Sequence, residues 1–157
     1  MERELMAIIT QSILWGLAMT FSALASLWFS NGWETSHLTH IIILVLFSSI
    51  LAYPLARLAL HVLDRKKRFE TQLAGSFLFL SVATVGLTAA AYSLDYWSFY
   101  VQWHGPAFSR LWVWQFFFTN LGALYQFAVM GLKLYLPLGF IFLTLASWLI
   151  ARDKLAN

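Results

Sequence analysis

Four long apolar tracts constrain the fold of this chain more than any other feature of the sequence. They cover about residues 5–29, 38–63, 71–94 and 132–151. Each tract comes close to the ~20 residues that a helix needs to cross the hydrocarbon of a bilayer. The sequence therefore predicts an all-α integral membrane protein in which four transmembrane helices form a bundle.

The composition agrees with a membrane-embedded chain that has little soluble mass. Of 157 residues, 61% are hydrophobic and 11% are charged, whereas soluble domains contain roughly 25% charged residues. We expect a single membrane domain over residues 1–157. The net charge of +3 does not predict nucleic-acid binding, because the cations flank apolar tracts and do not cover one basic face. The absence of cysteine excludes disulfides and thiolate metal sites.

Arginine and lysine residues are distributed unevenly over the two sides of the predicted bundle. Eight of the ten flank the side that holds both termini, and only Arg110 and Lys133 fall on the other side. By the positive-inside rule we expect both termini in the cytoplasm, and a multi-pass protein of a bacterial inner membrane. The loop between the second and third tracts is strongly basic. We interpret it as a topology signal, or else as a docking site for lipid headgroups or a partner. Its cations are Arg65, Lys66, Lys67 and Arg68.

The segment 95–131, between the third and fourth tracts, is rich in aromatic residues. A fifth crossing here would place the C-terminal cations Arg152 and Lys154 on the outer side, against the positive-inside rule. We therefore expect an interfacial or extracytoplasmic helical segment, because Trp and Tyr favour the depth of the headgroups. The sequence leaves open whether residues 108–131 are interfacial, re-entrant or continuous with the fourth span. The expected bend lies near Gly131, Pro137 and Gly139.

Helical periodicity aligns polar side chains into two rows that are candidates for contacts with a ligand or a partner. Either row could instead line a passage. The structural alternatives are a water-facing edge for the first row, and for the second an arginine whose long stem reaches the headgroups. The first row contains Gln115, Thr119, Gln126 and Lys133, and the second contains Tyr53, Arg57 and His61.

Small residues recur on one side of the first and third tracts. Such residues let membrane helices approach closely, either inside one bundle or between copies of the chain. The residues concerned are Gly16 and Ser26 in the first tract, and Gly75, Gly86 and Ala90 in the third.

No pattern in the sequence predicts catalysis. There is no serine, histidine and acid arrangement for nucleophilic attack and no glycine loop for phosphate. We expect no catalytic residue and no cofactor. A metal site is only weakly indicated, since glutamate and histidine at this spacing are poor evidence for one. Its candidate ligands are Glu34, His37, His40 and His104.

These observations favour a non-enzymatic membrane subunit that self-associates or packs in a larger complex, with a role in assembly, sensing or signal relay. The alternatives are an oligomeric ion channel or small transporter, and a lipid-, quinone- or metal-binding subunit of a membrane enzyme. The expected partners are membrane lipids together with other copies of the chain, or another membrane or cytoplasmic subunit.

Overall fold

The computed structural model describes residues 2–32, 37–63 and 68–156, and these ranges form helices without any strand. The all-α prediction is therefore confirmed for the described residues. In chain order the elements are α1 (Glu2–Phe29), α2 (Leu38–Leu63), α3 (Phe69–Tyr100), the 3₁₀ turn η2 (Val101–Trp103), α4 (Arg110–Gln126), the π-helical turn η3 (Phe127–Gly131), the 3₁₀ turn η4 (Leu132–Tyr135) and α5 (Leu138–Ala156).

Three of these helices are long and apolar enough to cross a membrane: α1, α2 and α3. A fourth candidate is the pair formed by Arg110–Tyr135 and Leu138–Asp153, which are bent by 72° relative to one another. The pair has the form of a broken span or of a re-entrant loop. The chain thus has the helices of a multi-pass membrane protein.

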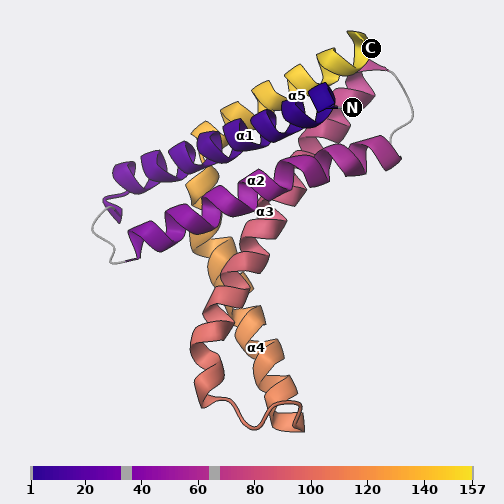
Figure 1. Cartoon of the computed structure of the whole chain (residues 1–157). Coiled ribbons are helices and arrows are strands. Elements are labelled where there is room, and N and C mark those ends of the chain that lie inside the picture. Colours follow the sequence, from indigo (N-terminus) through magenta and orange to yellow (C-terminus); the bar gives the residue numbers. More distant parts are fainter. Residues whose placement is uncertain (1, 33–36, 64–67, 157) are drawn as a thin grey trace.

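The helices form a bundle from which a hairpin extends (Figure 1). α1, α2 and α5 run side by side, and both termini lie at one end of the bundle, which we call the terminal end. α3 starts at the terminal end, packs against α2 and α5, and then continues beyond the bundle. There α4 lies beside it and returns the chain towards α5.

α3 is longer than the sequence pattern predicted. The third tract was expected to end near residue 94, but the helix continues to Tyr100. No proline or glycine occurs between residues 95 and 104, so nothing interrupts the backbone hydrogen bonds there. At 1.5 Å per residue the 32 residues of α3 are about 48 Å long, against roughly 30 Å of hydrocarbon. Its second half must therefore tilt or leave the hydrocarbon.

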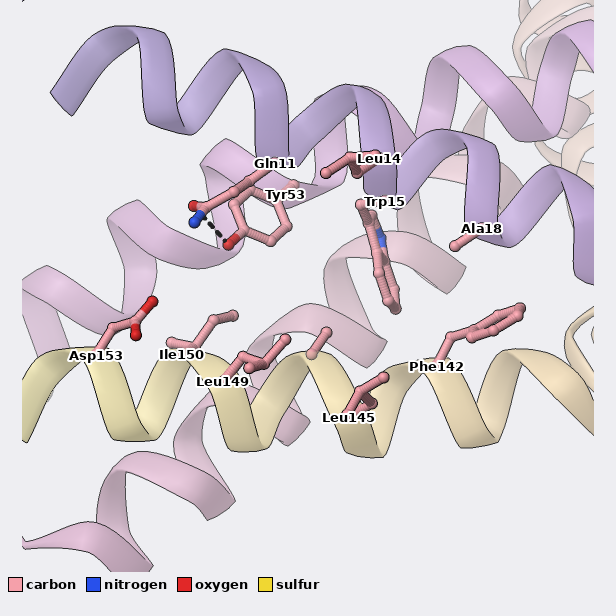
Figure 2. Close-up of a pocket in the computed structure, with 11 residues that line it drawn as sticks. Gln11, Leu14, Trp15, Ala18, Tyr53, Phe142, Leu145, Leu149, Ile150 and Asp153 are labelled. Carbon is pink, nitrogen blue, oxygen red and sulfur yellow. Dashed lines mark hydrogen bonds between the residues drawn. The ribbon is translucent and has the colours of Figure 1, made fainter. Parts of the chain in front are cut away.

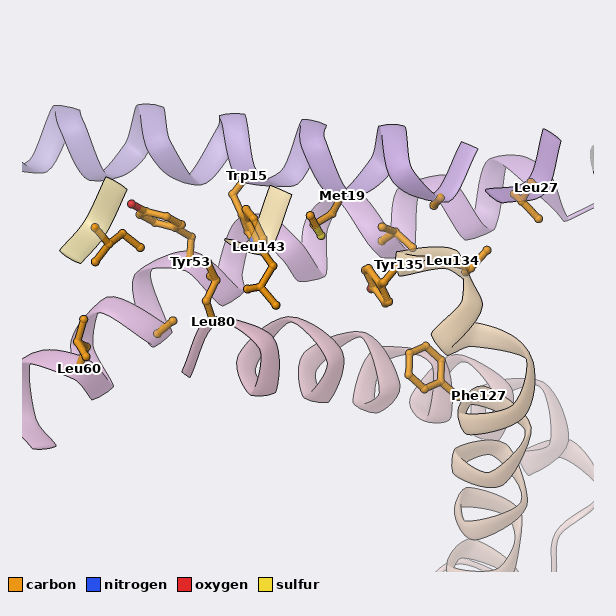
Figure 3. Packing of buried hydrophobic residues seen from close by; sticks show 14 residues of the cluster. Trp15, Met19, Leu27, Tyr53, Leu60, Leu80, Phe127, Leu134, Tyr135 and Leu143 are labelled. Atoms are coloured by element: carbon orange, nitrogen blue, oxygen red, sulfur yellow. The ribbon is translucent and has the colours of Figure 1, made fainter. Parts of the chain in front are cut away.

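The buried apolar cluster joins all the helices of the bundle (Figure 3). Met19 from α1, Leu60 from α2 and Leu80 from α3 are each at most 2% exposed. The turns between α4 and α5 belong to the same cluster, through Phe127 and Tyr135. The break between α4 and α5 is therefore packed in protein.

α1 supplies the hydrogen bonds that the break between α4 and α5 requires. The hydroxyl of Ser22 donates to the carbonyl of Leu134 at 3.1 Å and accepts from the backbone N–H of Gly139 at 2.8 Å. The hydroxyl of Ser26 donates to the carbonyl of Lys133 at 2.8 Å. Irregular backbone at membrane depth is tolerated only where protein or water satisfies its polar groups. We call these three hydrogen bonds the serine clasp.

We expect Ser22→Ala to destabilise the protein by about 1–3 kcal/mol, because it leaves one buried carbonyl and one buried N–H of the break without their partner. Unfolding in a detergent titration measures this loss. The matched control is Ser30→Ala, since Ser30 directly follows α1, is exposed, and its hydroxyl donates to carbonyls of the last turn of α1. Equal stabilities of the two variants would show that the serine clasp does not support the break.

Candidate functional site

The predicted row on α2 passes from the interior to the surface and is not gathered around a passage. Tyr53 is 5% exposed, and its hydroxyl donates to Oε1 of Gln11 on α1 at 2.9 Å. One turn further along, Arg57 is half-buried, and His61 after it is exposed. Tyr53 thus binds α2 to α1 in the interior of the bundle. Arg57 places a positive charge nearer the terminal end.

A cavity of about 230 Å³ lies beside Tyr53, between α1 and α5 (Figure 2). The side chains along most of its length are apolar, and polar groups gather at one end. That end holds Gln11, Tyr53 and Asp153, whereas Ala18 and Phe142 line the other end. Sequence reasoning missed this cavity, because no local pattern indicates that α1 and α5 line it together.

The predicted row on α4 is divided between different partners. The side-chain oxygen of Gln115 accepts from the N–H of Gly105 at 2.8 Å, and the Thr119 hydroxyl lies 3.3 Å from Nε2 of His104. Both contacts fasten α4 to the loop that follows η2. Gln126 is half-buried and Lys133 is exposed. The first half of the row is thus used inside the chain, which weakens its interpretation as the lining of a passage.

The histidines predicted as weak metal ligands have other partners. Nε2 of His40 lies 3.0 Å from a carboxylate oxygen of Asp95, which joins the start of α2 to α3. His104 contacts Thr119, His37 is exposed, and Glu34 lies outside the described residues. Across residues 2–32, 37–63 and 68–156, no three histidine, aspartate or glutamate side chains gather into a possible metal site.

The small residues predicted as packing positions fall into two groups. Gly16 is buried where α1 crosses α2, and a Cβ placed there would collide with Ile50. Ser26 belongs to the serine clasp. Gly86 and Ala90 instead lie on the exposed side of α3, and a Cβ placed on Gly86 would have no described atom within 4 Å.

Gly75 of α3 is half-buried and lies one residue from the buried Ser76.

The predicted basic loop is described only in part. Its last cation, Arg68, is exposed and precedes the first turn of α3. Arg65, Lys66 and Lys67 lie outside the described residues.

A buried polar column along α3 was not predicted. Its members follow one another at spacings of four, eight, four and five positions, and they face the interior of the bundle. Three of them bond to other elements. Nε1 of Trp15 donates to the Thr84 hydroxyl at 3.0 Å, the Tyr135 hydroxyl in η4 donates to that of Thr88 at 2.7 Å, and the Ser93 hydroxyl donates to Oδ1 of Asn120 on α4 at 2.5 Å. The spacing was visible in the sequence, but hydroxyl groups alone do not reveal which face is buried. The column contains Gln72, Ser76, Thr84, Thr88 and Ser93.

No protein-family model, curated protein or solved structure matches this chain. The functional interpretation therefore depends on the geometry of the molecule itself.

Thr84→Val is expected to cost about 1–3 kcal/mol of stability, because it leaves the buried indole N–H of Trp15 without an acceptor. Detergent-induced unfolding followed by Trp fluorescence measures the effect. Thr144→Val provides the control, since this hydroxyl is exposed and bonds only the carbonyl of Phe140 in its own helix. If both variants lost the same free energy of unfolding, the buried Thr84 hydroxyl would contribute no more to stability than an exposed one.

Proposed function

We propose that this chain is a non-enzymatic membrane subunit that associates through the outer face of α3, with copies of itself or with another membrane subunit. The observation that carries the proposal is the exposed pair Gly86 and Ala90, four residues apart on a helix. Small residues at this spacing allow two membrane helices to bring their backbones together.

The rest of this face continues the same stripe along α3. Every fourth residue is exposed and apolar, so the stripe follows one ridge of the helix. Val82 is 60% exposed and Leu94 is 56% exposed. The pair Gly86 and Ala90 lies between these bulky side chains and forms a shallow step in which a partner helix could pack. The outer face of α3 contains Leu78, Val82, Gly86, Ala90 and Leu94.

The aromatic hairpin, formed by the second half of α3, η2 and α4, adds a second uncovered surface. Its interior is filled by aromatic contacts, such as Trp97 against Trp112 and Phe116. Many of its other rings face outwards: Trp114 is 61% exposed and Phe118 is 60% exposed. Aromatic residues are enriched in the buried parts of protein interfaces. Trp and Tyr also suit the depth of the headgroups, which supports an interfacial position for α4.

We further propose that the terminal end faces the cytoplasm. Arg57 lies in the last two turns of α2, Arg68 directly precedes α3, and Arg152 lies in the last two turns of α5. These three helix ends are at the terminal end, and the positive-inside rule places such cations on the cytoplasmic side. The basic loop would then be available to anionic headgroups or to a cytoplasmic partner, as sensing or signal relay requires. A bacterial inner membrane stays a prediction from the same charge pattern.

Replacing Gly86 by leucine tests the proposed association. The new side chain meets open space within the described chain and improves helix propensity, so stability should change by no more than about 0.5 kcal/mol. Association should weaken by at least about tenfold, because leucine separates the two backbones. The measurement is energy transfer between singly labelled copies in liposomes, together with native mass spectrometry of the particle extracted from its own membrane.

Gly122→Leu on α4 is the matched control, because a Cβ at Gly122 also meets no described atom within 4 Å. Loss of association in Gly86→Leu alone supports the outer face of α3. Loss of association in Gly122→Leu alone would show that the interface lies on α4, which would contradict the proposed interface on α3. A protein that stays monomeric in both measurements, without a co-purifying chain, would overturn the proposed function.

A further inference from the structure

We propose that the cavity between α1 and α5 binds one acyl chain of a glycerophospholipid from the leaflet at the terminal end. Gln11 donates a hydrogen bond to the ester carbonyl of that chain. The site therefore recognises the point where a hydrocarbon tail joins its carbonyl, and not a headgroup. This inference is independent of the proposed assembly, because the cavity and the outer face of α3 share no residue.

The size of the cavity suits part of a lipid and not a complete small ligand. Its volume of about 230 Å³ is below the roughly 300–1,000 Å³ of pockets that enclose drug-sized molecules. Along α1 it extends from Gln11 to Ala18, about 10 Å at helical rise. Next to Ala18, α1 and α5 contact one another through Phe21 and Phe142, whose ring centroids lie 6.4 Å apart. This space accommodates the part of an acyl chain nearest its carbonyl.

The cavity is also open to the membrane. Leu14 is 60% exposed, Leu145 is 54% exposed and Leu149 is 42% exposed, although all three line the cavity. Trp15 and Ile150, which also line it, are buried. The medium around such an opening consists of acyl chains, so a lipid tail can enter the cavity sideways from the bilayer.

The polar end of the cavity offers a hydrogen-bond donor. Figure 2 shows the Gln11 amide there, next to the Tyr53 hydroxyl. The amide oxygen accepts from that hydroxyl at 2.9 Å, which leaves the NH₂ group of Gln11 as a donor. Asp153 lies at the same end but has its own partner within the chain, so no lipid group is assigned to it.

Gln11 also lies at the depth where a leaflet holds its ester carbonyls. The carboxyl group of Glu4, near the start of α1, belongs among the headgroups, and Gln11 follows about 10 Å further along the helix. The interfacial layer on each side of the hydrocarbon is about 5–8 Å thick. The amide is therefore near the boundary of the hydrocarbon, where each acyl chain begins. A donor at this depth needs an acceptor, and the ester carbonyl is one.

The test is a native mass spectrometry titration of the full chain in detergent with two glycerol-headgroup phospholipids of equal tail length. One has ester-linked tails, and the other has ether-linked tails, which lack the carbonyl. Contacts with the headgroup are common to both lipids and cancel in the comparison. We expect the ester lipid to bind about fivefold more tightly, which corresponds to one neutral hydrogen bond. Equal affinities, or tighter binding of the ether lipid, would overturn the proposal.

A matched pair of variants tests the role of Gln11. Gln11→Met and Tyr53→Phe both remove the hydrogen bond between α1 and α2, but only Gln11→Met removes the amide donor. We expect the preference for the ester lipid to disappear in Gln11→Met and to persist in Tyr53→Phe. Retention of the preference in Gln11→Met, or its loss in both variants, would contradict the hydrogen bond to the ester.

Two further variants test the position of the tail. Ala18→Phe and Ala146→Phe place a ring in the cavity from α1 and from α5, so each should weaken the binding of both lipids by at least about tenfold. Ala128→Phe is the control, because Ala128 is exposed and does not line the cavity. Unchanged affinity in a folded Ala18→Phe or Ala146→Phe would contradict the site. If neither variant folds, the comparison of Gln11→Met with Tyr53→Phe decides.

Discussion

The structure depends on how the backbone N–H and C=O groups find hydrogen-bond partners at the break between α4 and α5. A regular helix bonds all its own N–H and C=O groups, but a break exposes several of them, and lipid cannot replace the missing partners. Ser22 meets this need twice, since its single hydroxyl accepts from Gly139 and donates to Leu134. The Tyr135 hydroxyl finds Thr88 on α3. The break is therefore held from two sides, by α1 and by α3.

The arrangement of the other elements follows from this break. The 72° bend between the two halves directs α4 away from α5 and places it against the second half of α3. The hairpin that results is tied together by polar contacts near its tip, through Gln115 and Thr119. Its outward surface has no partner among the described residues, and neither has the exposed pair Gly86 and Ala90. These surfaces are the basis of the proposed association.

Patterns of neighbouring residues in the sequence predicted the features that depend on neighbouring residues, such as helix ends and bends. Apolar length identified α1 and α2 almost to their ends, and Gly131 and Pro137 indicated where the fourth span bends. Helical periodicity aligned Gln115 with Thr119, but it could not reveal that a loop supplies their partners. Contacts between distant segments were beyond such reasoning: Ser22 and Gly139 are 117 positions apart. The cavity was missed for the same reason, because Gln11 and Asp153 come to line one cavity only after α1 and α5 have packed.

A disulfide between positions 22 and 139 tests the serine clasp most directly. The natural chain contains no cysteine, and a Cβ placed on Gly139 lies 3.6 Å from that of Ser22, close to the ~3.8 Å typical of disulfides. We predict that Ser22→Cys/Gly139→Cys forms this bond nearly completely in the membrane under mild oxidation. Ser12→Cys/Gly139→Cys should not, because Ser12 lies about 15 Å further along α1. Free thiols at both positions of the first pair, as in the control, would contradict the break held by α1.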